Sequence, residues 1–420
     1  MKIEGLDEGV LEGIRVLDFG HALAGPFAAT LLADHGADVI KIERPGAGDA
    51  MRDLGPVGPS GRAWWKSMGR GKRCLALDWK HPRSRPVIES LVRAADVLVE
   101  SFRPGVLERN DLGPDVLHAW NPGLIVLRVS GYGQTGPYSA RPGFGKAAEA
   151  LSGLCDLTGF PDGPPLHPGF PMGDMTTGLM GAFGVMLALQ AVRLGGRGQV
   201  IDLGIYETPM RLIDYHVPIR TGTDRMPARN GNRQPMSFAP SGIYRTSDGQ
   251  WITYSAATFP VAQRVLRLIG ADALAGLDSL TAVCAYDDEI DERMQAWVSQ
   301  RTADQVLAAF RSAEAVAEWV YGIDDILADP HVAARGNIVA VDGDPCKVVN
   351  VVPRLSDTPG RVRWLGRAVG SDTIEVLRDV AGLDPGSIRT LIEAGAVAIP
   401  PDAPDGASTP PSGEENARAP

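Results

Sequence analysis

An aspartate at the start of a predicted helix could act as a carboxylate nucleophile. Asp174 belongs to the turn 173–178, which follows a Pro/Gly-rich loop at 160–165 and opens the most apolar predicted helix, 175–193. A free aspartate has a pKa of about 3.9, so it is ionised at pH 7 and can attack an electrophile without a partner base. A structural role competes with this interpretation, because aspartate is among the residues that best cap a helix.

Basic side chains gather in a segment that could bind an anionic ligand. Residues 61–85 contain eight lysines and arginines and one acid, Asp78, and Lys41 and Arg44 lie upstream at the end of a predicted strand. Ligands of open α/β sheets bind at the carboxyl ends of the strands, and Arg and Lys bind phosphate. A solvated surface strip is the alternative. The chain has no Walker loop and no G-x-G-x-x-G after the first strand, which disfavours a dinucleotide cofactor.

Other chemistry-bearing residues give weaker signals. Glycines in the turn 130–138, after a predicted strand, would let a ligand approach the backbone closely. The seven histidines show no metal-ligand spacing, and the chain has no G-x-S-x-G elbow that would activate a serine. The four cysteines lie far apart with no C-x-x-C pair, which argues against a disulfide framework or a zinc site. We expect neither metal nor serine catalysis.

Strand-like and helix-like segments alternate over the first two hundred residues. Apolar β-branched runs predict strands at 14–19, 38–43, 97–100, 124–129 and 199–203. Helical composition, with Pro and Gly at the expected ends, predicts helices at about 26–34, 84–95, 145–153 and 175–193. This order predicts an α/β fold with a mostly parallel, Rossmann-like sheet, whose strand ends would carry the residues discussed above.

The pattern changes after an Arg/Asn/Pro/Gly-rich connector at 221–240. A hairpin is predicted across Ser247–Gly249, followed by helices at about 259–269, 288–299 and 303–311. Strand-like residues return at 338–341 and 346–349, and a final helix is predicted at 371–395. We therefore predict a large Rossmann-like domain made of 10–220 and 335–398, a small α+β domain at 225–330, and a disordered Pro-rich tail at 399–420.

Composition restricts the classes of partner. The chain has 420 residues, of which 44% are apolar, and a net charge of −10, which argues against a general nucleic-acid binder. The uncharged stretch 175–192 contains Thr, Gly and Gln, so a buried helix is favoured over a membrane span. The acidic N-terminus lacks the apolar region of a signal peptide. We expect a cytoplasmic protein without nucleic-acid or membrane partners.

Eight sequence blocks follow one another along the chain: Val16–Phe19, Ala24–Pro26, Gly36–Arg44, Leu77–Lys80, Ala95–Phe102, Ser130–Gln134, Gly173–Asp174 and Gly196–Gln199. In this order they resemble the class III CoA-transferase family, which includes the formyl-CoA, carnitine and aryl-succinate types. The resemblance is strong over 10–215 and continues to about 396. It implies two interlocked chains, each with a Rossmann-like domain and a small domain, and hence a homodimer.

The same resemblance implies a reaction. Asp174 falls where the family has its catalytic aspartate, and six residues fall where family members contact CoA: Ala24, Arg44, Leu77, Ser101, Phe102 and Arg109. The implied enzyme moves CoA from an acyl-CoA donor to a small carboxylic acid, through an aspartyl anhydride and an aspartyl-CoA thioester. CoA is then part of the substrate, and no permanently bound cofactor is expected.

The chain also departs from parts of the family. Leu23 stands where formyl-CoA transferases have a glutamine, and Phe144–Lys146 lacks their acidic residue, which disfavours oxalate and formate. Two alternatives stay open. An α-methylacyl-CoA racemase would need a histidine near Phe144, which is absent. A non-catalytic CoA-binding subunit of a heteromeric transferase would not need Asp174. A NAD(P)-binding protein is disfavoured by the missing glycine fingerprint.

Overall fold

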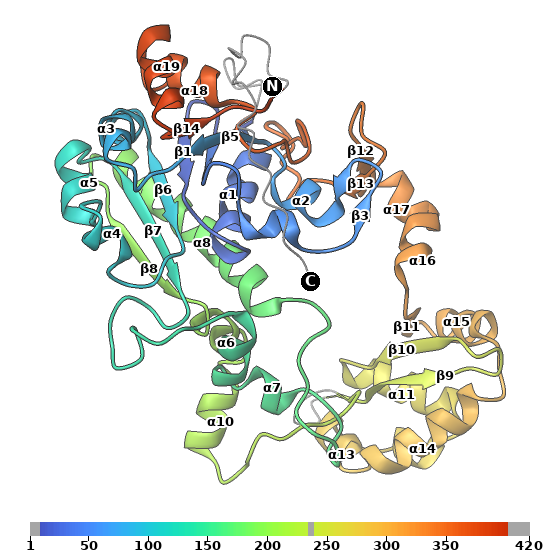
Figure 1. Cartoon of the computed structure of the whole chain (residues 1–420). Coiled ribbons are helices and arrows are strands. Elements are labelled where there is room, and N and C mark those ends of the chain that lie inside the picture. Colours follow the sequence, from blue (N-terminus) through green and yellow to red (C-terminus); the bar gives the residue numbers. More distant parts are fainter. Residues whose placement is uncertain (1–8, 234–238, 402–420) are drawn as a thin grey trace, which may run out of the picture. The chain divides into compact units, whose positions relative to one another are not determined.

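A computed structural model of the chain describes residues 9–233 and 239–401 (Figure 1). These residues divide into two compact units. The first comprises the described residues of 1–145, 173–208 and 337–420, and the second comprises those of 146–172 and 209–336. The predicted small domain, 225–330, lies within the second unit. Residues 402–420 of the predicted disordered tail lie outside the described part of the chain.

A seven-stranded sheet forms the centre of the first unit. Its order is β14 (Val397–Ala398), β5 (Lys72–Leu77), β2 (Asp38–Glu43), β1 (Arg15–Asp18), β6 (Val97–Glu100), β7 (Ile125–Ser130) and β8 (Val200–Gly204). All neighbours are parallel except β14, which pairs antiparallel with β5. Without β14 the order in the chain is 3-2-1-4-5-6, that of doubly wound nucleotide-binding folds. The predicted α/β fold with a mostly parallel sheet is confirmed.

Helices cover both faces of this sheet (Figure 1), so β5, β2, β1, β6 and β7 are buried along almost their whole length, whereas the edge strand β8 alternates between exposed and half-buried residues. On one face, Gly25 of α1 lies against Val99 and Gly181 of α8 against Leu127. On the other face, Leu98 and Val126 join an apolar core with α3, α5, α18 and α19. The bounds are α1 (Ala24–Asp34), α8 (Met172–Arg193), α3 (Arg85–Arg93), α5 (Pro114–Trp120), α18 (Thr373–Asp379) and α19 (Pro385–Glu393).

Shorter elements complete the first unit. Two small antiparallel pairs, β3 with β4 and β12 with β13, stand apart from the main sheet. The bounds are β3 (Val57–Gly58), β4 (Gly61–Arg62), β12 (Ile338–Ala340), β13 (Lys347–Val349), α2 (Ala63–Met68), α4 (Val106–Arg109), and two 3₁₀ turns, Ala50–Asp53 and Pro82–Ser84. The strand pair β12–β13 matches the strand-like segments predicted at 338–341 and 346–349.

One prediction in this unit is wrong, and one strand is missing from the predictions. The single helix predicted at 371–395 is two helices, because Gly382 takes a positive φ of 71° and Asp384 caps a new helix that begins at Pro385. Strand β5 was not predicted, since its first residues, Lys72 and Arg73, belong to the basic segment. Lys72 is nevertheless fully buried.

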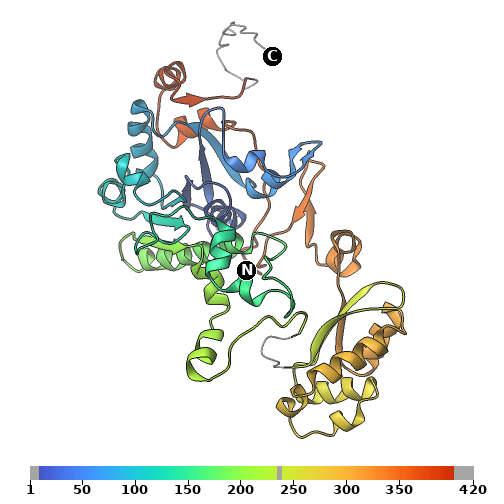
Figure 2. The same ribbon diagram turned by 60° about the horizontal axis from the view of Figure 1, so that its bottom comes forward.

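The second unit contains a three-stranded antiparallel sheet, β11-β10-β9, whose core-facing residues pack against α11, α14 and α15 (Figure 2). The predicted hairpin is confirmed: β9 (Ser241–Arg245) and β10 (Trp251–Ser255) flank a turn in which Gly249 has a φ of 81°. The other bounds are α6 (Gly145–Leu151), α7 (Leu154–Leu157), α9 (Glu207–Leu212), α10 (His216–Gly222), α11 (Phe259–Leu268), α12 (Asp272–Ala275), α13 (Leu280–Cys284), α14 (Asp287–Val298), α15 (Ala303–Ser312), β11 (Val316–Trp319), α16 (Ile323–Ala328) and α17 (Pro330–Ala334).

Helix α8 has one buried and one exposed apolar side. Val185 and Ala188 are buried, whereas Leu179, Phe183 and Leu187 are each more than half exposed, at 60%, 57% and 57%. Among the described residues α8 is the one helix whose length and composition would suit a membrane span, a test that core helices of soluble proteins also pass. The helix predicted to be buried is therefore buried on one side only.

Candidate active site

Asp174 lies in the first turn of α8. The helix begins at Met172, so Asp174 is its third residue and not the N-cap residue of the structural interpretation. Its side chain is half-buried. A carboxylate in the first turn faces the positive end of the helix dipole, which stabilises negative charge there.

Glycines allow the backbone to approach Asp174 closely. A Cβ atom at Gly145 would overlap the Asp174 carboxylate, and a Cβ at Gly178 would lie 2.7 Å from the Ala24 carbonyl oxygen. In the glycine-rich turn, a Cβ at Gly131 would lie 2.7 Å from the Cα of Gly143. Side chains at these positions would therefore push apart the segments that surround the carboxylate.

A cavity of about 150 Å³ opens beside Asp174. It brings together four of the seven residues predicted for the site, namely Asp174, Ala24, Ser101 and Phe102. Its other lining residues are His21, Ala22, Leu23, Arg103, Pro104, Val129, Ser130, Gly131, Ser139, Arg141, Gly143, Phe144 and Ile205.

A larger cavity of about 510 Å³ adjoins the first, and His21 and Phe102 line both. Arg44 lines the larger cavity, as predicted for a CoA contact, together with Lys80 and Trp79. The Trp79 ring lies 5.1 Å from that of Phe102, and Lys80 Nζ lies 5.1 Å from the Trp79 ring centre. This cavity therefore combines exposed cations with stacked aromatic rings.

Two residues predicted for the site line neither cavity. Leu77 is fully buried at the end of β5, so its side chain faces the apolar core. Arg109 is exposed at the end of α4.

Both cavities lie at the carboxyl ends of the parallel strands. The segments after β1 and β6 meet there, because the His21 amide donates to Ser101 Oγ at 2.7 Å and Ser101 Oγ donates back to the His21 carbonyl at 3.1 Å. The strand order reverses between β1 and β6, and such a switch point is where open α/β sheets bind their ligands.

Beneath the loop that follows β1 lie four buried charges, Asp18, Lys41, Asp49 and Lys72, which we call the buried charge network. Lys72 Nζ lies 2.8 Å from Asp18, and Lys41 Nζ lies 2.8 Å from Asp49 and 3.6 Å from Asp18. All four side chains are at most 2% exposed.

The network holds the backbone of the active-site loop. Lys41 donates to the Gly20 carbonyl, and Lys72 donates to the Pro26 carbonyl at 2.7 Å. Asp49 accepts from the amide of Ala22, whose φ of 62° is strained for a residue with a Cβ. The loop conformation beside Asp174 is thus maintained by charged partners on other strands.

For Lys41 and Asp49, the attraction of opposite charges shifts the pKa more than burial does. Burial disfavours the ammonium of Lys41, but Asp18 and Asp49 raise its pKa above the ordinary value. Burial would raise the pKa of Asp49, yet Lys41 and a hydrogen bond from His21 hold that pKa well below its usual range. For Lys72, burial lowers the pKa and Asp18 opposes this change. Lys41 and Asp49 are therefore a charged pair at neutral pH.

The structure divides the basic segment into two groups. Four of its eight cations, Lys66, Arg70, Lys72 and Arg73, form ion pairs with aspartates, so neither the phosphate interpretation nor the solvated strip describes them. Phosphate binding stays a prediction for the exposed cations. Arg70 pairs with Asp34, Arg73 with Asp38 and Lys66 with Asp344, at 2.5, 2.6 and 2.7 Å. These cations join separate parts of the first unit. Among the basic residues singled out in the sequence, Arg44 and Lys80 are the exposed ones that line a cavity.

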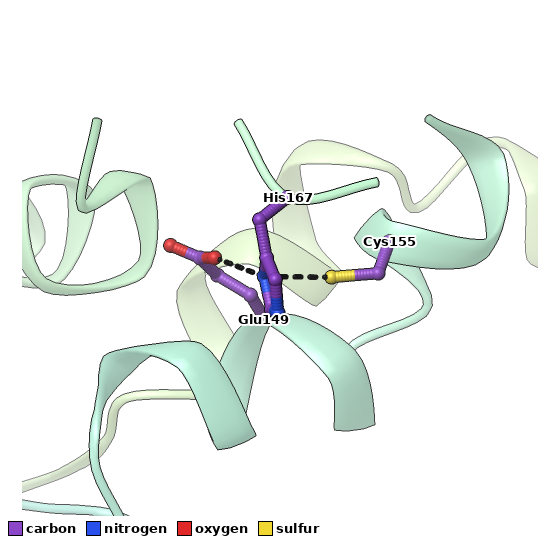
Figure 3. A group of neighbouring side chains, drawn as sticks. All are labelled: Glu149, Cys155 and His167. Atoms are coloured by element: carbon purple, nitrogen blue, oxygen red, sulfur yellow. Dashed lines mark hydrogen bonds and ion pairs between the residues drawn. The ribbon is translucent and has the colours of Figure 1, made fainter. Parts of the chain in front are cut away.

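The second unit contains a cluster that sequence spacing did not indicate (Figure 3). His167 Nδ1 lies 2.9 Å from Glu149 Oε2 and 3.3 Å from Cys155 Sγ, and zinc accepts all three ligand types. Lys146 Nζ lies 3.0 Å from the same Glu149 oxygen and already neutralises it. Hydrogen bonds in this cluster tie the loop that contains His167 to α6 and α7.

Comparisons with known proteins show which family the chain belongs to. The sequence model of CoA-transferase family III matches residues 11–373, and the chain belongs to this family. It is 40% identical over 388 residues to the succinyl-CoA–D-citramalate CoA-transferase of Chloroflexus aurantiacus, covering 91% of this chain and 96% of that protein. It is also 40% identical over 390 residues to the beta subunit of that organism's succinyl-CoA–L-malate CoA-transferase, covering 91% and 96%.

A solved structure has the same fold. The crystal structure of a CAIB/BAIF family protein from Brucella suis superposes with a TM-score of 0.78 at 28% identity, covering 89% of this chain and 100% of that one. The chain is thus an enzyme, a class III CoA-transferase, and the family suggested by its sequence blocks is confirmed.

Loss of one cation from the buried charge network is expected to destabilise the first unit. Lys72→Met should lower the free energy of unfolding by about 3–5 kcal/mol, because it leaves Asp18 buried with incomplete compensation. Urea unfolding followed by circular dichroism measures this loss. The control, Arg378→Met, breaks an exposed pair with Asp379 and should leave the free energy of unfolding close to that of the wild type. Equal losses in the two variants would contradict a special role for the network.

Gly145→Ala is expected to lower kcat/KM by about 10²-fold while the protein stays folded, because the new methyl group would displace the Asp174 carboxylate. Steady-state CoA-transfer rates and the melting temperature measure the two effects. Gly169→Ala is the matched control, since a Cβ there meets nothing within 4 Å. Wild-type rates in Gly145→Ala would show that the carboxylate position is not critical.

Proposed function

We propose that the enzyme transfers CoA between acyl-CoA and a carboxylic acid through covalent intermediates on Asp174. The observation that carries this proposal is the position of Asp174 in a small cavity that shares His21 and Phe102 with a larger, cation-lined cavity. CoA would place its phosphates near Arg44 and Lys80, and its thioester would extend past Phe102 to Asp174.

In the first half of the reaction, a carboxylate oxygen of Asp174 attacks the thioester carbonyl of the donor. The C–S bond breaks, which yields a mixed anhydride and CoA thiolate. The thiolate then attacks the aspartyl carbonyl carbon and releases the donor acid as its carboxylate. An aspartyl-CoA thioester remains on the enzyme.

The second half reverses these steps with the acceptor acid. The acceptor carboxylate attacks the aspartyl thioester, and the released thiolate attacks the acceptor acyl carbon, which frees the new acyl-CoA and Asp174. Carboxylates and thiolates exchange throughout, so no proton is taken up or released. This explains why a nucleophilic aspartate needs no histidine base within reach.

We propose short dicarboxylic acids as the substrates. The relatives described above are named for succinyl-CoA, citramalate and malate, each of which carries two carboxyl groups as the free acid. A cavity of about 150 Å³ has the volume of about five water molecules at ~30 Å³ each, which suits a small acid rather than a long acyl chain.

Replacement of Asp174 tests its role in the chemical step separately from CoA binding. Asp174→Asn should lower kcat by on the order of 10⁴–10⁶-fold, because the amide cannot form the anhydride, while CoA affinity measured by calorimetry stays close to wild type. Wild-type enzyme mixed with donor and analysed by mass spectrometry should carry CoA on the peptide that contains Asp174. Full activity in Asp174→Ala would refute the assignment.

We propose further that two copies of the chain assemble, as the family resemblance implies. Leu179, Phe183 and Leu187 recur every four residues on the exposed side of α8 and form an apolar stripe. A second copy that covered this stripe would remove it from water. A relative named as a beta subunit raises a different outcome, in which a paralogous chain takes that place.

Charge on the stripe is expected to prevent self-association. Wild-type protein should sediment as a dimer at micromolar concentration, and Phe183→Asp with Leu187→Asp should sediment as a folded monomer, because burying two carboxylates costs more than the interface gains. Sedimentation velocity with circular dichroism measures both. A monomeric wild-type protein would contradict the homodimer and favour the paralogous partner.

A further inference from the structure

The cavity at Asp174 contains two arginines, and neither is paired with a carboxylate among the described residues. Among the residues that line it, Asp174 is the one carboxylate, whereas Arg103 and Arg141 are both arginines. Within the described part of the chain, neither guanidinium has a carboxylate at ion-pair distance. Arg128 of β7, by contrast, is paired with Glu100 at 2.7 Å.

Contacts with its neighbours hold Arg141 in place. Its guanidinium carbon lies 3.7 Å from the ring centre of Tyr138, and its amide donates to the Tyr138 carbonyl at 2.8 Å. The Tyr138 ring in turn makes an edge contact with Tyr132 at 6.0 Å. A guanidinium stacked on an aromatic ring keeps its N–H groups directed outward in one plane, as carboxylate recognition requires. Arg103 has no comparable support.

A second feature of the cavity points to a polar ligand. Ser130, the last residue of β7, lines the cavity and is 7% exposed. Its hydroxyl has no hydrogen-bond partner within the described residues. Buried hydroxyls normally have a partner, and a ligand with an oxygen at this point would supply one.

We propose that Arg141 binds the second carboxylate of a dicarboxylic substrate and thereby selects diacids over monoacids. One carboxylate of the acid would meet the aspartyl thioester at Asp174, and the other would pair with the Arg141 guanidinium. Ser130 would hydrogen-bond to an oxygen of the same acid. The inference rests on the proposed function, since it assigns the substrate class at that site.

Two acceptors of equal chain length, succinate and butyrate, test this role. In a ping-pong exchange, kcat/KM for the acceptor reports the second half of the reaction, so donor binding does not affect it. Wild-type enzyme should prefer succinate. Arg141→Met should lower kcat/KM for succinate by on the order of 10–100-fold and leave that for butyrate within about twofold, because one charged hydrogen-bonded contact is lost.

Further variants check the interpretation. Arg141→Lys keeps the charge without the planar fork and should recover part of the succinate rate. Ser130→Ala should lower kcat/KM for succinate by about 3–10-fold, as expected for one neutral hydrogen bond. Arg389→Met, an exposed arginine on α19, is the matched control and should behave as wild type.

Three results would overturn the assignment. They are equal losses for succinate and butyrate in Arg141→Met, a wild-type enzyme that does not distinguish the two acids, and a selective loss in Arg103→Met instead of Arg141→Met. A wild-type protein that transfers CoA to none of a panel of acids would instead refute the proposed function, so the two failures can be told apart.

Discussion

Two buried lysines and two buried aspartates meet beneath the loop that lines the active-site cavity. Lys41 donates to the Gly20 carbonyl of that loop and Lys72 to the Pro26 carbonyl in the first turn of α1, and Asp18 and Asp49 bind both the lysines and the loop amides. The network joins β1, β2, β5 and the segment after β2, so three neighbouring strands share one set of charges. Because Ala22 is held at a positive φ by the same contacts, the shape of the cavity wall depends on ionic partners that lie below it.

Close backbone contact is the second requirement of the site. Gly145 leaves room for the Asp174 carboxylate, Gly178 lets α8 approach α1, and Gly131 lies against Gly143. The charge network fixes the loop on one side of the cavity, and these glycines allow the helix and the turn on the other side to approach it. The position of Asp174 therefore depends on these glycines as well as on the charged side chains of the network.

Much of the first unit could be predicted from the sequence because buried parallel strands are short apolar runs with clear helices between them. Strand β5 could not be predicted because it begins with a lysine, Lys72. The buried partner that neutralises this lysine, Asp18, is remote in the chain, and local composition does not show it. The sequence also could not show which cations of the basic segment are paired with remote aspartates, as Lys66, Arg70 and Arg73 are. The Glu149–Cys155–His167 cluster was missed because its spacing matches no ligand motif. Asp174 could be found, since family blocks placed it, but its cavity partner Arg141 could not.

Two of the points at which the chain passes from one unit to the other lie beside the nucleophile. The first unit ends at Gly145, which backs the Asp174 carboxylate, and resumes at Gly173, the residue before it. The stretch between them, 146–172, is assigned to the second unit and is anchored internally by the Glu149–His167 pair. The Asp174 carboxylate therefore lies next to two of the points at which the chain passes from one unit to the other.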